Sequence, residues 1–333
     1  MQSKKLDKMK TRYILSTSFA ALLIYGCVSQ KPTERIEFMA DEAYPEGVAY
    51  DSTANVYYVS SARLGTIGKV TPQGNYSMLY TDNTLKSTYG VKVSGNKVLI
   101  AAGDANYSKF TSPDTRTKMA RLLAIDSQSG KKLMDVDLSQ LLPGKHFPND
   151  IAVDPQGNMY ITDSFAHAIY RVTPEGKAIV FAKDKQFETM GVGLNGIVYH
   201  PDGFLLASNT NTGQVYKVDI KNPSKVQKVR LDQYFLGADG LLLDDSNHLT
   251  IVVNGGNDKI FRLESTDGWQ SAKLSASTLA SDRFTYPSTA TRFQNQTWIM
   301  NAKFSELVDS NSVPSKNFAI QKAVFKPLPK PKD

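Results

Sequence analysis

The repeated pattern of short apolar strands is the feature that most limits how this chain can fold. Its clearest copy is residues 148–182, PNDIAVDPQGNMYITDSFAHAIYRVTPEGKAIVFA, where four apolar runs are separated by Gly, Pro and Asn turns. Each run has the length and composition of one strand in an antiparallel sheet. The same order of runs and turns returns, less closely in the second and last copies, in segments that begin at Pro45, Thr88, Leu194, Ala238 and Tyr286.

The spacing of these copies predicts a β-propeller. Equivalent positions fall near residues 46, 90, 149, 195, 239 and 287, at intervals of 44 to 59 residues. Four-stranded units at this period are typical of propeller blades, and one blade can bury its two faces only against neighbouring blades. We therefore predict an all-β, six-bladed β-propeller with four-stranded blades over residues 35–326. An outer strand at Arg35–Phe38 is expected to pair with the last blade and close the ring.

The first 26 residues are expected to lie outside this fold, as a secretory signal peptide. Five Lys or Arg residues precede an apolar run over 13–26, which is short for a membrane span. The run ends in Gly26-Cys27 and resembles the lipobox of bacterial lipoproteins, which implies a diacylglycerol on Cys27. An ordinary signal peptide followed by a chance Cys is the alternative. Residues 27–34 then form the lipidated Cys and its tether, and 327–333 a flexible tail.

Charge and cysteine content narrow the class of protein further. The formal net charge is +7, but residues 1–26 carry a net +4 of it, which leaves about +3 spread over the mature chain. Such interspersed charge does not favour nucleic acid as a partner. Cys27 is the only cysteine, so an internal disulfide and a cysteine nucleophile are both excluded. We expect an exported, monomeric cell-envelope lipoprotein, in the outer membrane or a periplasm-facing membrane and attached through its lipid alone.

Polar residues stand at the start of four of the six units, immediately before the opening apolar strand. The first strand of each blade lines the central channel, so these side chains should point at one axis. Two carboxylates and two amide carbonyls form an all-oxygen set that suits Ca²⁺ above Mg²⁺. Each of these dipeptides, taken alone, is typical of a turn. A metal site is predicted only because all four dipeptides occupy the same position in the repeat. The residues are Glu46-Gly47, Asn149-Asp150, Asn195-Gly196 and Asp239-Gly240.

Four segments that contain these residues resemble a known family. They are PEGVAYD, PNDIAVDPQGNMYITD, LNGIVYHPDG and ADGLLLDD. That family is the gluconolactonase/regucalcin (senescence marker protein) and luciferin-regenerating-enzyme-like family of six-bladed propellers, and the resemblance covers roughly residues 43–305. The resemblance implies one divalent metal ion, held by Glu46, Asn149, Asn195 and Asp239. It also implies hydrolysis of lactones or phosphoesters.

Two positions depart from the family pattern and concern the substrate. Gluconolactonases carry a basic residue two places before the Asn of the third blade, where this chain has Phe147 with His146 beside it. The sixth blade opens with Tyr286 and lacks the channel His of related fluorophosphatases. Neither sugar lactones nor phosphotriesters are therefore indicated. We expect His146, Phe147, Tyr89 and Tyr286 to contact a small-molecule substrate, and we expect His167, His200 and His248 to be solvated.

Two functions remain open. The first is metal-dependent hydrolysis of a lactone or related ester, with Asp239 or Glu46 taking a proton from the attacking water. Ca²⁺ is the preferred ion, with Mn²⁺, Mg²⁺ or Zn²⁺ as other candidates, and Asp150 either supports the ligands or caps its own turn. The second is a non-catalytic envelope propeller that binds a ligand or partner with a structural Ca²⁺. A strictosidine-synthase-like activity is not favoured, because no acidic base stands at the matching position.

Overall fold

The computed structural model describes residues 34–309 and 311–328 of the chain. The predicted signal peptide, the lipidation site Cys27 and the tether up to residue 33 lie outside the described residues. Residues 329–333 of the predicted tail lie outside them as well. The lipoprotein assignment therefore stays a prediction.

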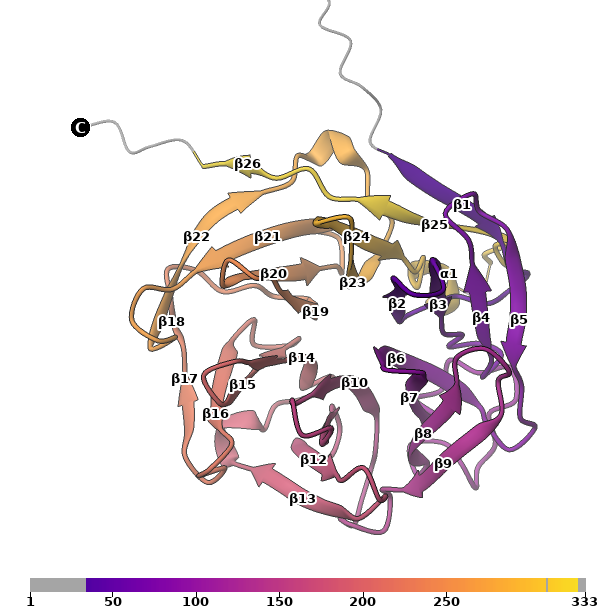
Figure 1. The fold of residues 1–333 in the computed structure, drawn as a ribbon, viewed down its shortest axis with the longest axis horizontal. Coiled ribbons are helices and arrows are strands. Elements are labelled where there is room, and N and C mark those ends of the chain that lie inside the picture. The colour runs from indigo at the N-terminus through magenta and orange to yellow at the C-terminus, as the bar shows by residue number, and fades with distance from the viewer. Residues whose placement is uncertain (1–33, 310, 329–333) are drawn as a thin grey trace, which may run out of the picture. The chain divides into compact units, whose positions relative to one another are not determined.

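The described residues form six antiparallel sheets arranged as the blades of a propeller, as predicted (Figure 1). Blade one consists of β2 (Val48–Asp51), β3 (Val56–Val59), β4 (Ile67–Val70) and β5 (Tyr76–Tyr80). Blade two consists of β6 (Ser87–Ser94), β7 (Lys97–Gly103), β8 (Ala120–Asp126) and β9 (Lys132–Asp137). Blade three consists of β10 (Pro148–Val153), β11 (Met159–Asp163), β12 (Ala168–Val172) and β13 (Ala178–Lys183).

The second half of the chain repeats this order. Blade four consists of β14 (Leu194–His200), β15 (Phe204–Asn209), β16 (Val215–Asp219) and β17 (Val226–Lys228). Blade five consists of β19 (Ala238–Leu243), β20 (His248–Val253), β21 (Lys259–Glu264) and β22 (Ser271–Ser277). Blade six consists of β23 (Pro287–Phe293), β24 (Gln296–Asn301), β25 (Asn317–Lys322) and β1 (Arg35–Met39). In every blade the strand that comes first in this order, β2, β6, β10, β14, β19 or β23, lies nearest the axis (Figure 1).

Strand β1 closes the ring, and this confirms the expected outer strand. It pairs antiparallel with β25, so that the first and last strands of the propeller share one sheet. Ile36 and Phe38 are buried while Arg35, Glu37 and Met39 are exposed, which is the alternation of an edge strand with one covered face. The ring is therefore fastened by hydrogen bonds between segments that are far apart in the sequence.

The fifth sheet is larger than a four-stranded blade. Short strands β18 (Arg230–Leu231) and β26 (Lys326–Pro327) both pair with its outer strand β22. An outer strand presents unpaired N–H and C=O groups that an adjacent extended segment can satisfy. Pro327, predicted as the first residue of a flexible tail, instead lies in β26.

Large side chains fill the space between blades. Tyr57, Tyr58, Tyr160 and Tyr170 are completely buried, in agreement with a packing role. His200, expected to be solvated, is buried at the end of β14, where it stacks on Phe204. Among the described residues the helical segments are short, namely α1 (Ser305–Val308), η1 (Lys185–Phe187) and η2 (Ala280–Asp282), and none has the length and apolar character needed to cross a membrane.

Candidate functional site

A bulge near the start of the inner strand aims side chains at the propeller axis. The pairing register shifts between Pro148 and Ile151, and equivalent shifts occur in blades two, four, five and six. A bulge leaves residues unpaired in the ladder and turns their side chains away from the usual alternation. The residues released in this way are Tyr89-Gly90, Asn149-Asp150, Asn195-Gly196, Asp239-Gly240 and Ser288-Thr289.

The glycines at these bulges permit neighbouring inner strands to approach closely. A Cβ on Gly196 would lie 2.4 Å from the carbonyl oxygen of Asp239, and one on Gly47 would lie 2.3 Å from that of Tyr89. Gly90 and Gly240 face the next blade in the same way, at 2.4 and 2.8 Å. The X-Gly dipeptides are therefore contacts between inner strands, rather than the turns that such dipeptides usually form.

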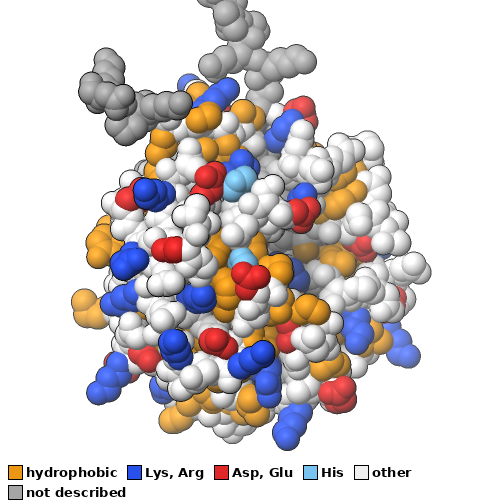
Figure 2. Space-filling model, turned by 60° about the vertical axis from the view of Figure 1, so that its left-hand side comes forward, with side chains coloured by type: hydrophobic (Ala, Val, Ile, Leu, Met, Phe, Trp, Pro, Cys, Tyr) orange, Lys and Arg blue, Asp and Glu red, His pale blue; other side chains and the backbone are white. Residues whose placement is uncertain are grey.

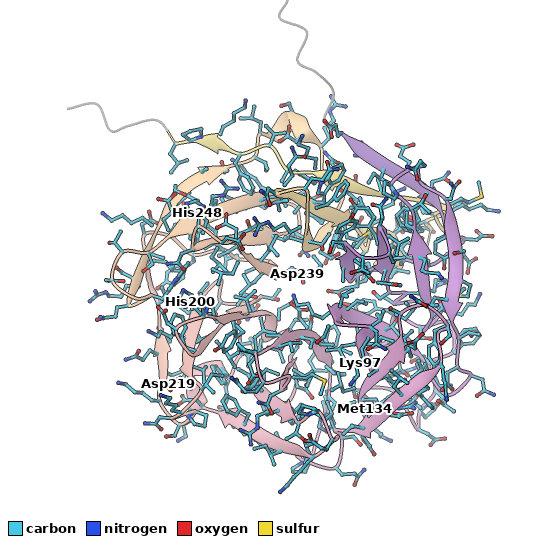
Figure 3. All side chains as sticks on the ribbon, in the orientation of Figure 1. Lys97, Met134, His200, Asp219, Asp239 and His248 are labelled. Atoms are coloured by element: carbon cyan, nitrogen blue, oxygen red, sulfur yellow. The ribbon has the colours of Figure 1, made fainter. Side chains whose placement is uncertain are left out.

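The four predicted ligand residues line one cavity on the axis, with a volume of about 60 Å³. Figure 3 shows Asp239 at the centre of the ring, whereas His200 and His248 lie farther out. The rest of the wall is partly aromatic. The lining residues are Glu46, Tyr107, Phe147, Asn149, Val192, Asn195, Thr210, Asp239, Asn254, Tyr286 and Phe304.

Each of the four predicted ligands has one buried oxygen without a hydrogen-bond partner. These atoms are Glu46 Oε2, Asn149 Oδ1, Asn195 Oδ1 and Asp239 Oδ1. A buried polar atom left without a partner costs about 1–3 kcal/mol, so four in one small cavity call for a partner shared by all of them. An oxygen-binding cation satisfies this requirement, and the residues present therefore fit the ion that the family resemblance implies.

Neighbouring hydroxyl groups decide which end of each amide faces the cavity. Ser164 Oγ donates to the carbonyl oxygen of Leu194, so its lone pairs are left to accept from Asn149 Nδ2 at 3.1 Å. Thr210 Oγ1 donates to the carbonyl of Ala238 and accepts from Asn195 Nδ2 at 2.9 Å. Because each amide nitrogen is bonded outward, each amide oxygen points into the cavity.

Hydrogen bonds also hold the two carboxylates. Asn254 Nδ2 donates to Asp239 Oδ2 and to the carbonyl oxygen of Pro287, and this leaves Asp239 Oδ1 free. The backbone N–H of Glu46 donates to Ser60 Oγ at 3.2 Å, and its carbonyl accepts from Ser288 Oγ at 2.6 Å. Bonds from its own blade and from blade six therefore fix the backbone of Glu46.

Burial and mutual repulsion disfavour ionisation of the carboxyl groups around the axis. Burial, together with the charges of Asp239 and Asp150, raises the pKa of Glu46 well above its usual value. Burial likewise raises the pKa of Asp239 to about 8, with Asp150 adding to the effect. Acidic groups that disfavour one another's ionisation are stabilised by a nearby cation, which reverses these shifts.

Asp150 occupies the inner-strand position that is glycine in four of the other blades. Its carboxylate accepts from the N–H of Ile151 at 2.8 Å and from the N–H of Ile197 in the next blade at 3.2 Å. It is buried but does not line the cavity. The side chain therefore links blades three and four behind the predicted ligands Asn149 and Asn195.

The four aromatic and histidine positions expected to contact substrate divide into two pairs. Phe147 and Tyr286 line the cavity. Tyr89 is fully buried, accepts a hydrogen bond from the N–H of Ala105 and packs 4.7 Å from the ring of Phe147. His146 is also buried and faces Asp163. Neither Tyr89 nor His146 lies in the cavity wall.

His146 belongs to a saturated cluster behind the cavity. Its Nδ1 lies 2.8 Å from Asp163 Oδ2 and its Nε2 lies 3.1 Å from the carbonyl oxygen of Leu142. Both neighbours are acceptors, so both ring nitrogens donate and the ring is the imidazolium. Burial opposes this charge, but the hydrogen bond and charge of Asp163 outweigh it and raise the pKa of His146. Asp163 Oδ1 also accepts from the N–H of Phe147, which positions Phe147 in the cavity wall.

The supporting polar residues were not predicted, although the sequence contains a regular signal for them. Each predicted ligand bonds to a residue 14 or 15 positions later, immediately after the second strand of its own blade. These partners are Ser60, Ser164, Thr210 and Asn254. Tyr107 and Phe304, which also line the cavity, come from the long connections between the second and third strands of blades two and six.

The site differs from a cluster of His, Cys and acidic ligands. Among the described residues no group of three or more His, Cys, Asp or Glu side chains could hold a metal ion. The axial cluster combines two carboxylates with two amides, as the sequence predicts. A six-bladed propeller with an oxygen cluster on its axis is the class of protein that the fold and site define.

Comparison with known families places the chain within this class. Residues 44–281 match the model of the SMP-30/Gluconolactonase/LRE-like region. The chain belongs to the SMP-30/gluconolactonase/LRE-like family, which confirms the resemblance inferred from the blade starts. A search of curated proteins finds no match.

Solved structures show the same fold at low sequence identity. The major allergen Mala s 1 of Malassezia sympodialis is 16% identical with a TM-score of 0.69, over 88% of this chain and 96% of the allergen. Virginiamycin B lyase from Staphylococcus aureus is 14% identical with a TM-score of 0.56, over 87% and 99% of the two chains. A protein described as a putative gluconolactonase is 15% identical with a TM-score of 0.55, over 90% and 96%.

Proposed function

We propose that this protein is a divalent-metal-dependent hydrolase that acts on a lactone or related ester, with Ca²⁺ as the preferred ion. The observation that carries the proposal is the set of four buried oxygen atoms without partners in one axial cavity. Family membership supports a hydrolase-like propeller. Glu46, Asn149, Asn195 and Asp239 would hold the ion.

The chemistry divides between the ion and the chain. A bound divalent ion supplies Lewis-acid polarisation of the substrate carbonyl and stabilises the negative charge that develops on its oxygen. Asp239 and Glu46 carry carboxylate oxygens able to take a proton from an attacking water. Asn254 keeps Asp239 oriented through its hydrogen bond, so that the free Oδ1 stays in the cavity. Phe147, Tyr286 and Phe304 add aromatic surface to the cavity wall.

Metal removal and restoration tests this proposal. Residues 28–333 are treated with chelator and assayed on a panel of lactones and aryl esters, with Ca²⁺, Mn²⁺, Mg²⁺ or Zn²⁺ added back. We expect hydrolysis to return with metal and to be lost in Asp239→Asn and Asn195→Ala. Stabilisation by Ca²⁺ without turnover of any substrate would instead support a non-catalytic binding propeller, and failure to bind any metal would refute both.

We also propose that the protein is exported and anchored through a lipid on Cys27. The support is the basic and apolar start of the sequence and the Gly26-Cys27 step. Mass spectrometry of the membrane fraction should show a mature chain that begins at a diacylglyceryl Cys27. A Cys27→Ser variant should lose the lipid and leave the membrane fraction, whereas an unmodified N-terminus in the wild type would contradict the anchor.

A further inference from the structure

A second hollow opens beside the axial cavity, on the side of blades four and five. It has a volume of about 430 Å³ and shares Val192, Thr210, Asn254 and Tyr286 with the cavity wall. Its other lining residues are Asn211, Leu236, Gly237 and Gly255. We call this hollow the side groove. Because the side groove and the cavity have four residues in common, a ligand held at the axis can extend directly into the groove.

Exposed apolar side chains surround the side groove. Leu236, in its wall, is 62% exposed, and Tyr234 on the same loop is 71% exposed. Met190, two residues before Val192 on the opposite loop, is 87% exposed. Large apolar groups in contact with water on two loops that both contribute to the groove wall mark a surface that gains free energy when a ligand covers it.

Neither hollow offers a positive charge. None of the described residues that line the cavity or the side groove is Lys, Arg or His, and the only charged ones are the acids Glu46 and Asp239. An anionic ligand would have to approach these buried carboxyl groups without a compensating cation from the chain. The lining therefore selects a ligand that is uncharged where it enters the side groove.

Backbone hydrogen bonds hold the side groove in shape. The N–H of Gly237 donates to the carbonyl of Thr210 at 2.9 Å, and the N–H of Asn254 donates to the carbonyl of Gly237 at 3.1 Å. Asn211 Nδ2 donates to Thr189 Oγ1 at 2.7 Å, which ties the loop that carries Met190 to the neighbouring turn. A groove formed before the ligand arrives costs little ordering entropy on binding.

From these observations we infer that the substrate is an uncharged carbonyl compound with an apolar tail, and that the side groove holds the tail. The inference rests on the proposed function for the nature of the reacting carbonyl group. The apolar rim, the absence of cationic lining and the continuity with the axial cavity support the tail and its neutrality independently of any reaction. Figure 2 shows charges of both signs scattered over the face in view, whereas the residues that line the side groove are uncharged.

Binding of hydrolysis-resistant analogues tests the inference without turnover. Valerolactams with side chains from ethyl to octyl are titrated by calorimetry into residues 28–333 in buffer with Ca²⁺. We expect Kd to fall about fourfold per added methylene until the side groove is filled, since each buried methylene contributes a constant increment. A lactam whose tail ends in a carboxylate should bind at least tenfold more weakly than its methyl-ended counterpart.

A matched pair of variants locates the tail. Leu236→Asp should remove the dependence on chain length, whereas Leu133→Asp, at a similarly exposed leucine on β9 of blade two, should retain it. Both side chains face solvent, and a thermal melt checks that both variants are folded. A Kd that does not depend on chain length, or a dependence that survives Leu236→Asp, would overturn the inference.

The same experiment separates this inference from the proposed hydrolase. Lactones of the same chain lengths are assayed for turnover in parallel. Lactam binding that depends on chain length, without turnover of any lactone, would support the side groove and count against the hydrolase. Turnover with no preference for chain length would support the hydrolase and overturn the side groove.

Discussion

Two buried polar clusters, one around Asp163 and one on the axis, both include residues of blade three and differ in one respect. Around Asp163 each carboxylate oxygen has partners, because His146 and Tyr170 contact Oδ2 and three backbone N–H groups contact Oδ1. Around the axis each of the four ligand residues leaves one oxygen without a partner. A cluster in which every polar atom has a hydrogen-bond partner stabilises the fold. A cluster that leaves oxygen atoms without partners is suited to bind an ion or ligand from solution.

The hydrogen-bond donors available near each carboxylate explain this difference. Asp163 faces the start of its own blade, where backbone N–H groups and an imidazolium are available. Asp239 faces three other acceptor-bearing residues across the axis, and among the described residues no backbone N–H donates to its carboxylate, whose Oδ2 accepts from the Asn254 side chain. The same residue type is therefore a structural anchor in one place and a candidate ligand in the other, and one substitution at both sites tests the distinction.

The largest expected effect is on function, from Asp239→Asn. An asparagine can keep the hydrogen bond from Asn254 but removes one of the two ligand charges. We expect turnover to fall at least about 10³-fold, which corresponds to roughly 4 kcal/mol of transition-state stabilisation. The melting temperature without added metal should stay the same or rise, because burial already disfavours the ionised form of this carboxyl. A marked loss of stability would show that Asp239 is structural.

The same change at Asp163 should have the opposite result. In Asp163→Asn an NH₂ group replaces an oxygen that faces two donors, and the imidazolium of His146 loses its charge partner. Breaking a buried pair of this kind costs about 3–5 kcal/mol, so we expect a large drop in melting temperature. Calcium affinity of the folded fraction, measured by calorimetry, should change less than tenfold. If Asp163→Asn and Asp239→Asn lowered calcium affinity equally, the two clusters would not differ in their role.

Calcium itself should stabilise the wild type by a smaller amount. An ion that binds only the folded state at 100 times its Kd adds about 2.7 kcal/mol, or roughly 4–5 °C in melting temperature for a domain of this size. Thermal melts with Ca²⁺ and with chelator measure this shift. Asp239→Asn provides the control that should show none, and Mg²⁺ at equal concentration should give a smaller shift.

The smallest expected effect is a pH dependence of stability from His146. Its pKa is raised in the folded protein, so its contribution is fully present below the unfolded value of about 6.5. The contribution is lost as the pH rises through the folded value. As the pH rises from 6, we expect the melting temperature of metal-free protein to decline by a few degrees through the loss of this contribution. The His146→Gln variant should be less stable at pH 6 and should decline less steeply than the wild type, because the raised pKa of Asp239 gives both proteins a decline of their own. An identical slope in both proteins would argue against the imidazolium.

The sequence predicts much of the architecture because the signals are local. Alternating apolar runs and turn residues return in every blade, so the blade number follows from the period. The closing strand, predicted at Arg35–Phe38 from the need to close the ring, spans Arg35–Met39. The predictions from sequence were wrong where burial or strand pairing depends on a segment that is distant in the sequence. Burial of His200 depends on packing at the end of blade four, and the extra strands of the fifth sheet depend on which segments reach its open edge.

For the candidate site, the sequence predicts which residues are present, whereas the structure shows which of their atoms are free to bind. The sequence by itself determined which residues stand at the start of each blade, since Glu46, Asn149, Asn195 and Asp239 share one position in the repeat. Only the tertiary structure decided that one oxygen of each is free, that His146 is turned away from the cavity and that an uncharged groove adjoins the axis. The physical reason is that these properties depend on hydrogen bonds and packing between separate blades, which no single repeat contains.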